Sequence, residues 1–405
     1  MPVLWSQTAN YPVSGNPWSA TPTKVSPGYA FFTPGVPIAA QEMNWLLNQK
    51  DLASVAGVSV PGVSWAAAGP LMPNTLGGTA YVAYTGGGYD PWIRKWLVCA
   101  VNNVSASDVL STSGFGESDF ASVSTGNTAG VQFVSATDDA SHYFGASIRF
   151  SDGALLIQRC TAGGAWSTVV TDAGSGTYKD AQIFTYQGTY IVCTAVTNST
   201  MIGFYAPFGG GAGGTWTSFL GPAIAGTALM TANNGSVIVC IPRASLPASY
   251  ATSATGTSFT TRSATPFTGH TTETPSGLCY SPADGLFVLM TISGGSNAFI
   301  YTSPDGINWQ QVTSFSATNV YGLAATAAGC ICALNVEQGG PFAGQYQAIF
   351  SVDAGATWHT SQNTLPTGLA NTFPQVLASP SGFLSTANNQ IRFSHNSGLP
   401  ALYGP

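Results

Sequence analysis

Short apolar runs separated by glycine-containing turns recur along most of the chain. Five of them follow a turn glycine at intervals of about 44 to 53 residues: Tyr190–Val192, Val237–Cys240, Leu286–Met290, Cys330–Leu334 and Phe383–Leu384. These runs are short and bounded by turn residues, which favours buried strands over helices. The pattern therefore predicts a chain built mainly from short strands that repeat at a near-constant interval.

Two turns between these runs share one order of residue types. Both contain Ser-x-Asp, then glycine, then tryptophan, and the residues concerned are Ser303, Asp305, Gly306 and Trp309, and Ser351, Asp353, Gly355, Thr357 and Trp358. An Asp side chain can accept backbone N–H bonds inside a turn, glycine tolerates a positive φ, and tryptophan can pack the hairpin onto its neighbour. We therefore expect these residues to have structural roles.

Weaker copies of the same turn extend the repeat over most of the chain. The aromatic residues that mark the copies are Trp65, Phe120, Trp166, Trp216, Phe259, Trp309 and Trp358, at steps of about 43 to 55 residues. A unit of this length with several short strands fits a four-stranded propeller blade. We therefore expect an all-β fold, a β-propeller of seven four-stranded blades, and a β-sandwich or jelly roll is the alternative.

The two complete turns resemble the Asp-box of BNR-like propeller proteins. That resemblance implies the propeller fold and, because sialidases occur among such proteins, it raises a glycan-cleaving enzyme as an alternative function. A site resembling that of a sialidase would need an arginine cluster, a Tyr–Glu pair and an Asp acid. The six arginines are scattered through the sequence, and no such constellation is recognised.

Residues 1–55 lack the repeat and are rich in proline and aromatic residues. One short helix is expected over 38–49, where Met43, Trp45, Leu46 and Leu47 supply apolar side chains after Pro37. We therefore divide the chain into a docking segment, 1–55, and a propeller, 56–405.

Residues 32–48, from Phe-Thr-Pro-Gly to Asn48, resemble the entry segment of structural proteins of tailed bacteriophages, such as tail fibres, spikes and decoration proteins. The resemblance implies that Met43, Trp45, Leu46 and Leu47 dock on other virion proteins. It also implies that the propeller is displayed in multiple copies on the exterior of the particle, with a role in host attachment.

Charged residues make up only 6% of the chain, and the net charge is −6. Without a basic stripe, nucleic acid and anionic membranes are not expected as partners. The N-terminus lacks the features of a secretory signal peptide, which fits release by lysis. The seven cysteines show no metal-ligand spacing, so they are expected to be buried thiols, and no metal or cofactor is expected.

Few ionisable residues are grouped in the sequence. Asp138 and Asp139 with His142 form the densest group, and we interpret it as a solvated loop. His270, beside Thr271, Thr272 and Glu273, is also expected in a surface loop. We therefore expect a non-enzymatic structural component of a tailed phage virion. If it binds a bacterial surface glycan, exposed aromatic rings and Asn, Thr and Ser side chains would do so.

Overall fold

The computed structural model divides the chain into two units, Met1–Gly62 and Val63–Pro405. It describes residues 23–25, 29–32, 64–65, 75–76, 79–90, 94–102, 107–112, 120–127, 133–134, 142–149, 151–161, 165–173, 177–207, 215–224, 226, 228–244, 249–263, 273–293, 297–317, 319–336, 346–365, 375–379, 382–387 and 390–395. Every regular element within these ranges is a β-strand.

In the first unit, β1 (Thr23–Val25) and β2 (Tyr29–Phe32) form an antiparallel pair. The helix expected over 38–49 lies outside the described residues. The proposed docking residues lie there too, and they are Met43, Trp45, Leu46 and Leu47.

The described residues of the second unit form six four-stranded antiparallel sheets and one further sheet. Five of them follow the chain without interruption: β9 (Phe133–Val134), β10 (His142–Ile148), β11 (Leu155–Thr161) and β12 (Ser167–Asp172); β13 (Asp180–Tyr186), β14 (Tyr190–Val196), β15 (Met201–Pro207) and β16 (Thr217–Leu220); β17 (Leu229–Asn233), β18 (Ile238–Pro242), β19 (Ser249–Ser253) and β20 (Thr260–Ser263); β21 (Glu273–Ser281), β22 (Leu286–Ser293), β23 (Asn297–Ser303) and β24 (Gln310–Ser316); β25 (Val320–Ala325), β26 (Ile331–Val336), β27 (Tyr346–Ser351) and β28 (His359–Leu365).

The sixth sheet joins the two ends of this unit. It consists of β29 (Gln375–Ala378), β30 (Gly382–Ala387), β31 (Gln390–His395) and β3 (Ser64–Trp65). Strand β3 pairs with β31 through Ser64 opposite His395 and Trp65 opposite Ser394. The outermost strand of the last sheet therefore comes from the start of the unit, which closes the fold through backbone hydrogen bonds.

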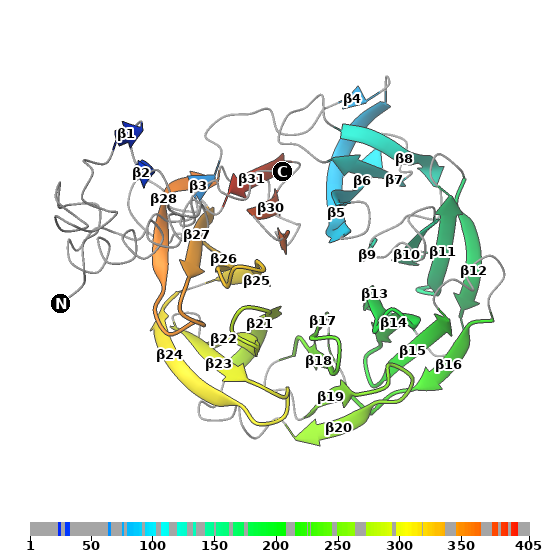
Figure 1. Ribbon diagram of the computed structural model, residues 1–405. Helices are drawn as coiled ribbons and strands as arrows, with labels where there is room; N and C mark the ends of the chain where they lie inside the picture. Colours follow the sequence, from blue (N-terminus) through cyan, green and yellow to red (C-terminus); the bar gives the residue numbers. More distant parts are fainter. Residues whose placement is uncertain are drawn as a thin grey trace. The chain divides into compact units, whose positions relative to one another are not determined.

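The sheets are arranged around a common centre, and each runs from an inner strand to an outer strand (Figure 1). The inner strands β13, β17, β21, β25 and β29 contact one another in sequence. This arrangement is a β-propeller, as the repeat predicted.

The predicted seven four-stranded blades are not what the structure contains, because it has six. Where a first four-stranded blade was expected, five strands form one sheet: β4 (Thr75–Leu76), β5 (Thr79–Asp90), β6 (Lys95–Asn102), β7 (Ser107–Thr112) and β8 (Phe120–Asn127). Strand β5 is long, and its start pairs with β4 while the rest pairs with β6 through two register shifts. A tight hairpin and bulges thus add a strand that the repeat interval does not reveal.

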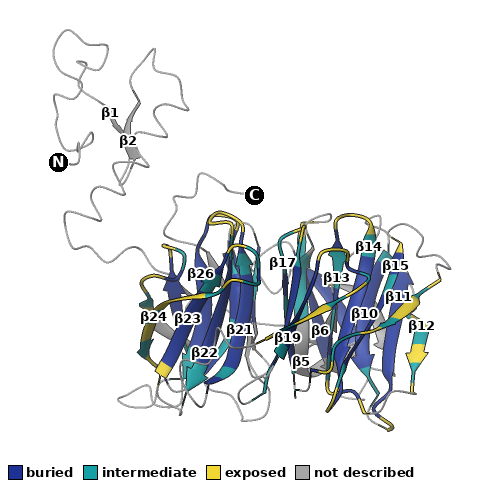
Figure 2. Ribbon diagram, turned by 90° about the horizontal axis from the view of Figure 1, so that it is seen from below, coloured by how far each residue is buried: buried dark blue, intermediate teal, exposed yellow. Residues whose placement is uncertain are grey.

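Burial follows the strand position within each sheet (Figure 2). The second strands, such as β14 and β22, are almost entirely buried, whereas the last strands β12, β16, β20 and β24 are largely exposed. Apolar side chains of neighbouring sheets form shared clusters, as where Val288 and Met290 of β22 pack with Ile331 of β26. The core therefore consists of the interfaces between sheets.

All seven cysteines are buried thiols, which confirms that prediction, and burial raises the pKa of thiols such as Cys99 and Cys193. Among the described residues, no helix has the length and apolar character required to cross a membrane.

Candidate functional site

The aromatic residues that mark the repeat each lie at the start of the last strand of a sheet. Phe120 opens β8, Trp166 and Trp216 precede β12 and β16, and Trp65 lies in β3. In the sheets that follow the chain without interruption, the turns that precede these aromatics therefore lead into the outer strand, whereas the outer strand β3 of the last sheet comes from the start of the unit.

The Asp305 turn, Ser303–Trp309, joins β23 to β24. Asp305 Oδ1 accepts hydrogen bonds from Ser303 Oγ at 2.9 Å and from the backbone N–H groups of Ile307 and Asn308 at 2.8 Å each. Its Oδ2 accepts a bond from Asn308 Nδ2 at 2.6 Å. Desolvation alone would raise the pKa of Asp305, but these bonds favour the carboxylate and lower the pKa to about 2.

The Asp353 turn, Ser351–Trp358, joins β27 to β28 by the same chemistry with one more residue. Asp353 accepts bonds from Ser351 Oγ at 2.8 Å and from the N–H and hydroxyl of Thr357 at 2.8 and 2.6 Å. The extra residue is accommodated by positive φ angles at Ala354 and Gly355, of 58° and 86°. Partial desolvation opposes ionisation, yet these bonds lower the pKa of Asp353.

The Ser253 turn, Ser253–Phe259, repeats the geometry without a carboxylate. Thr255 Oγ1 accepts the N–H groups of Thr257 and Ser258 at 3.3 Å each, and Ser253 Oγ accepts the N–H of Gly256 at 2.9 Å. A neutral hydroxyl at longer distance gives weaker bonds than Asp305 does.

These turns are also joints between neighbouring sheets. A Cβ added at Gly306 would lie 2.4 Å from Val239 Cγ2 of the preceding sheet. Trp309 Nε1 donates to the hydroxyl of Tyr250 at 3.3 Å, and that hydroxyl donates to the Ile307 carbonyl at 3.3 Å. The turn of one sheet is therefore fixed against the face of the sheet before it.

Two further carboxyl groups, those of Asp180 and Glu273, belong to the inner strands β13 and β21. Asp180 at the start of β13 accepts the N–H of Leu229 of β17 at 2.6 Å and the N–H of Ala181 at 2.9 Å, so it links two adjacent sheets. Desolvation raises the pKa of Asp180 to about 7, although both hydrogen bonds act in the opposite direction.

The surface loop expected around His270 does not extend to Glu273, and His270 itself lies outside the described residues. Glu273 opens β21 and is 2% exposed, and it accepts hydrogen bonds from the hydroxyls of Thr291 and Tyr301. Burial and the adjacent carboxylate raise the pKa of Tyr301. The Tyr301 hydroxyl is thus a hydrogen-bond donor inside the sheet and not an ionised nucleophile.

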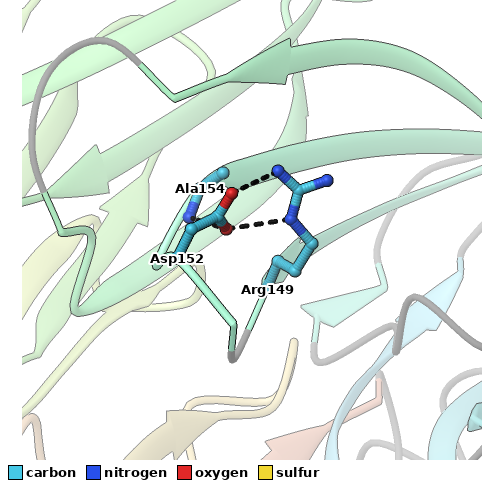
Figure 3. A network of polar contacts seen from close by, with 3 residues as sticks. All are labelled: Arg149, Asp152 and Ala154. Carbon is cyan, nitrogen blue, oxygen red and sulfur yellow. Dashed lines mark hydrogen bonds and ion pairs between the residues drawn. The ribbon is translucent and has the colours of Figure 1, made fainter.

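The connection between β10 and β11 carries an exposed ion pair (Figure 3). Arg149 binds both carboxylate oxygens of Asp152, which also accepts the N–H of Ala154 at 3.1 Å. The hydrogen bonds from Arg149 are the main cause that lowers the pKa of Asp152 to about 2. The pair closes a hairpin in which Gly153 has a φ of 69°.

Other arginines also have separate partners. The guanidinium of Arg159 lies 5.9 Å from the ring centre of Phe144, and that of Arg243 lies 5.7 Å from the ring centre of Tyr321. Of the predicted acidic group, Asp138 and Asp139 lie outside the described residues, and His142 opens β10 with a half-buried side chain. Within the described part of the chain, no group of three His, Cys, Asp or Glu residues is placed to hold a metal ion.

A row of four partly exposed aromatic rings, hereafter the aromatic band, crosses β14–β16 and continues onto the next sheet. Tyr190 and Tyr205 are 5.4 Å apart between ring centres, Tyr205 and Phe219 are 6.3 Å apart, and Phe219 and Phe259 stack at 5.2 Å. Sequence reasoning did not find the band because its members come from four segments that only the fold brings together.

Comparisons with known proteins give structural neighbours only. No protein-family profile matches the chain, and no curated protein matches its sequence. Three solved structures are similar: the extracellular domain of a hybrid two-component system from B. thetaiotaomicron (12% identity, 82% of this chain and 40% of that chain, TM-score 0.49), the hydrazine synthase of Kuenenia stuttgartiensis (10%, 79% and 97%, 0.49) and the periplasmic gluconolactonase of Pseudomonas aeruginosa (12%, 80% and 91%, 0.48).

The first of these neighbours is much longer than this chain, which spans 40% of its length. With identities of 10–12% and TM-scores below 0.5, these three structures support no inference about the activity of this chain. The class that the geometry defines is the β-propeller.

Proposed function

We propose that this protein is a non-enzymatic structural component of a tailed phage virion. Residues 1–55 attach it to other virion proteins through Met43, Trp45, Leu46 and Leu47, and the propeller faces outward in multiple copies and contacts a bacterial surface glycan. The resemblance of residues 32–48 to phage structural proteins supports the attachment.

The observation that carries the outward-facing role is the chemistry of the outer strands. Strands β12, β16, β20 and β24 expose mainly hydroxyl and amide side chains, such as Ser167, Thr217, Thr260 and Gln310, and few charges. A neutral surface rich in hydrogen-bonding groups suits contact with an uncharged polysaccharide better than contact with a polyanion.

The positions of the carboxylates support a structural role over the alternative, a sialidase-like glycan-cleaving enzyme. Asp305 and Asp353 hold turns, Asp180 links two sheets and Glu273 binds two hydroxyls inside one sheet. We propose that the Asp305 and Asp353 turns are Asp-box turns. We also propose that the five-stranded sheet β4–β8 serves as a seventh blade, because β5 contacts both β29 and β9.

The test is whether the protein is a particle component. Phage particles would be produced from a genome encoding the chain, purified on a density gradient and probed with an antibody to the propeller. We expect the wild-type chain to sediment with particles and a Leu46→Asp, Leu47→Asp variant to stay at the top of the gradient while still folded. Wild-type protein that never sediments with particles would refute the assignment.

A further inference from the structure

Among the described residues, the aromatic band extends further than the ring pair at another joint between sheets. At the joint between the sheets of β24 and β28, Phe315 faces Trp358 with ring centres 5.6 Å apart. Phe219 and Phe259 form the corresponding pair two joints earlier, between the sheets of β16 and β20. Tyr190 and Tyr205 then extend this pair into a row across the sheet of β13–β16.

The local sequence accommodates this row. A Cβ at position 203 would lie 1.8 Å from Phe219 Cζ, so the absence of a side chain at Gly203 lets the ring of Phe219 lie directly over β15. All four rings of the band are intermediate in exposure, neither buried in the core nor fully in solvent. The inner edges of these rings pack against the cluster that contains Val192 and Ile238.

The surroundings of the band are polar and mostly uncharged. Thr217 pairs with Tyr205 across the sheet and lies on the same face of β16 as Phe219. Ser258 and Thr260 flank Phe259, and all three of these hydroxyl residues are exposed. Half-exposed aromatic rings beside hydroxyl groups are suited to binding a sugar. The C–H groups of the sugar can stack on the rings, and its hydroxyls can form hydrogen bonds with the protein hydroxyls.

We propose that the aromatic band is a binding site for a neutral oligosaccharide, which stacks on the ring of Tyr205, contacts the ring of Tyr190 that stands at 83° to it, and forms hydrogen bonds with the hydroxyls around Phe219 and Phe259. A row of rings spaced 5.2 to 6.3 Å apart offers contacts to more than one sugar unit. The assignment of that sugar to a bacterial surface rests on the proposed function, whereas the binding itself does not.

The experiment uses the full chain and an array of bacterial oligosaccharides, with neutral and acidic members of equal length. We expect binding to neutral members. We expect Tyr205→Ala to weaken that binding at least tenfold, while Tyr205→Phe, which keeps the ring, stays within about threefold of the wild type. Tyr280, a half-buried tyrosine with its ring 5.1 Å from that of Phe287 in another sheet, provides the control, and Tyr280→Ala should bind as the wild type does.

Thermal melting of each variant separates loss of binding from loss of fold. If Tyr205→Ala does not fold, Tyr190→Ala at the end of the band makes the same test. Binding confined to acidic members, or no binding to any neutral member, would overturn the proposal. Binding by Tyr205→Ala and Tyr190→Ala as strong as that of the wild type would also overturn it. If the chain sediments with particles but binds no neutral oligosaccharide, the virion assignment stands and the binding site is refuted. If the chain binds neutral oligosaccharides but never sediments with particles, the binding site stands and the virion assignment is refuted.

Discussion

Replacing Asp305 with alanine is the sharpest test of the argument that the carboxylate holds the turn. The change removes the acceptor of four hydrogen bonds, two of them from the backbone N–H groups of Ile307 and Asn308. Bonds to a charged group contribute about 1.5 to 3 kcal/mol each when shielded, and less where water can replace them. Because Asp305 is partly exposed, we expect a total loss of about 2 to 3 kcal/mol.

Denaturant unfolding and thermal melting at pH 7 measure that loss. A loss of this size corresponds to a fall of about 3 to 4 °C in Tm for a propeller of this length. Asp305→Asn keeps one acceptor oxygen and should lose about 1 kcal/mol. Thr255→Ala in the Ser253 turn is the matched control, and it should lose about 0.5 to 1 kcal/mol because its hydroxyl bonds are neutral and long.

The pH dependence gives an independent check. The folded-state pKa of Asp305 is about 2, below the ordinary value near 3.9 for an unfolded chain, so its stabilisation is present above pH 4 and is lost as the pH falls towards 2. The difference between wild type and Asp305→Ala should therefore shrink at pH 2.5. A loss below about 0.5 kcal/mol for Asp305→Ala at pH 7 would show that the carboxylate does not hold this turn.

Three further predictions concern the joints between sheets. Trp358→Ala removes the ring that packs on Phe315 and should cost about 2 to 4 kcal/mol in urea unfolding, and a cost near zero would contradict its packing role. Gly306→Ala places a Cβ on a residue with a φ of 71° and against the side chain of Val239, so the Tm of this variant should fall by several degrees. An unchanged Tm would contradict both conflicts. The pKa of Asp180 near 7 lies above its unfolded value, so its contribution is present below pH 4 and is lost as the pH rises through 7. Melting from pH 4 to 8 should show a decline of about 2 to 4 kcal/mol that Asp180→Asn lacks, and identical profiles would refute this assignment.

The local chemistry of the turns was readable in the sequence. Ser303, Asp305 and the residues up to Trp309 are contiguous, so the bonds that define the turn depend on spacings of two or three residues. The aromatic marks at regular intervals likewise indicated a repeating unit of about one sheet, and the structure shows that they lie at the last strand of each sheet. Period, strand character and turn type are local properties, and the chain alone determines them.

Tertiary structure decided what depends on residues far apart in the chain. The pairing of Ser64 and Trp65 with Ser394 and His395, and the link from Asp180 to Leu229, have no local signature. The same holds for the fifth strand of the β4–β8 sheet and for the aromatic band. Register, burial and contacts between sheets are set when the sheets assemble into the propeller. Only then do strands from distant segments pair through hydrogen bonds and bury apolar surface against one another.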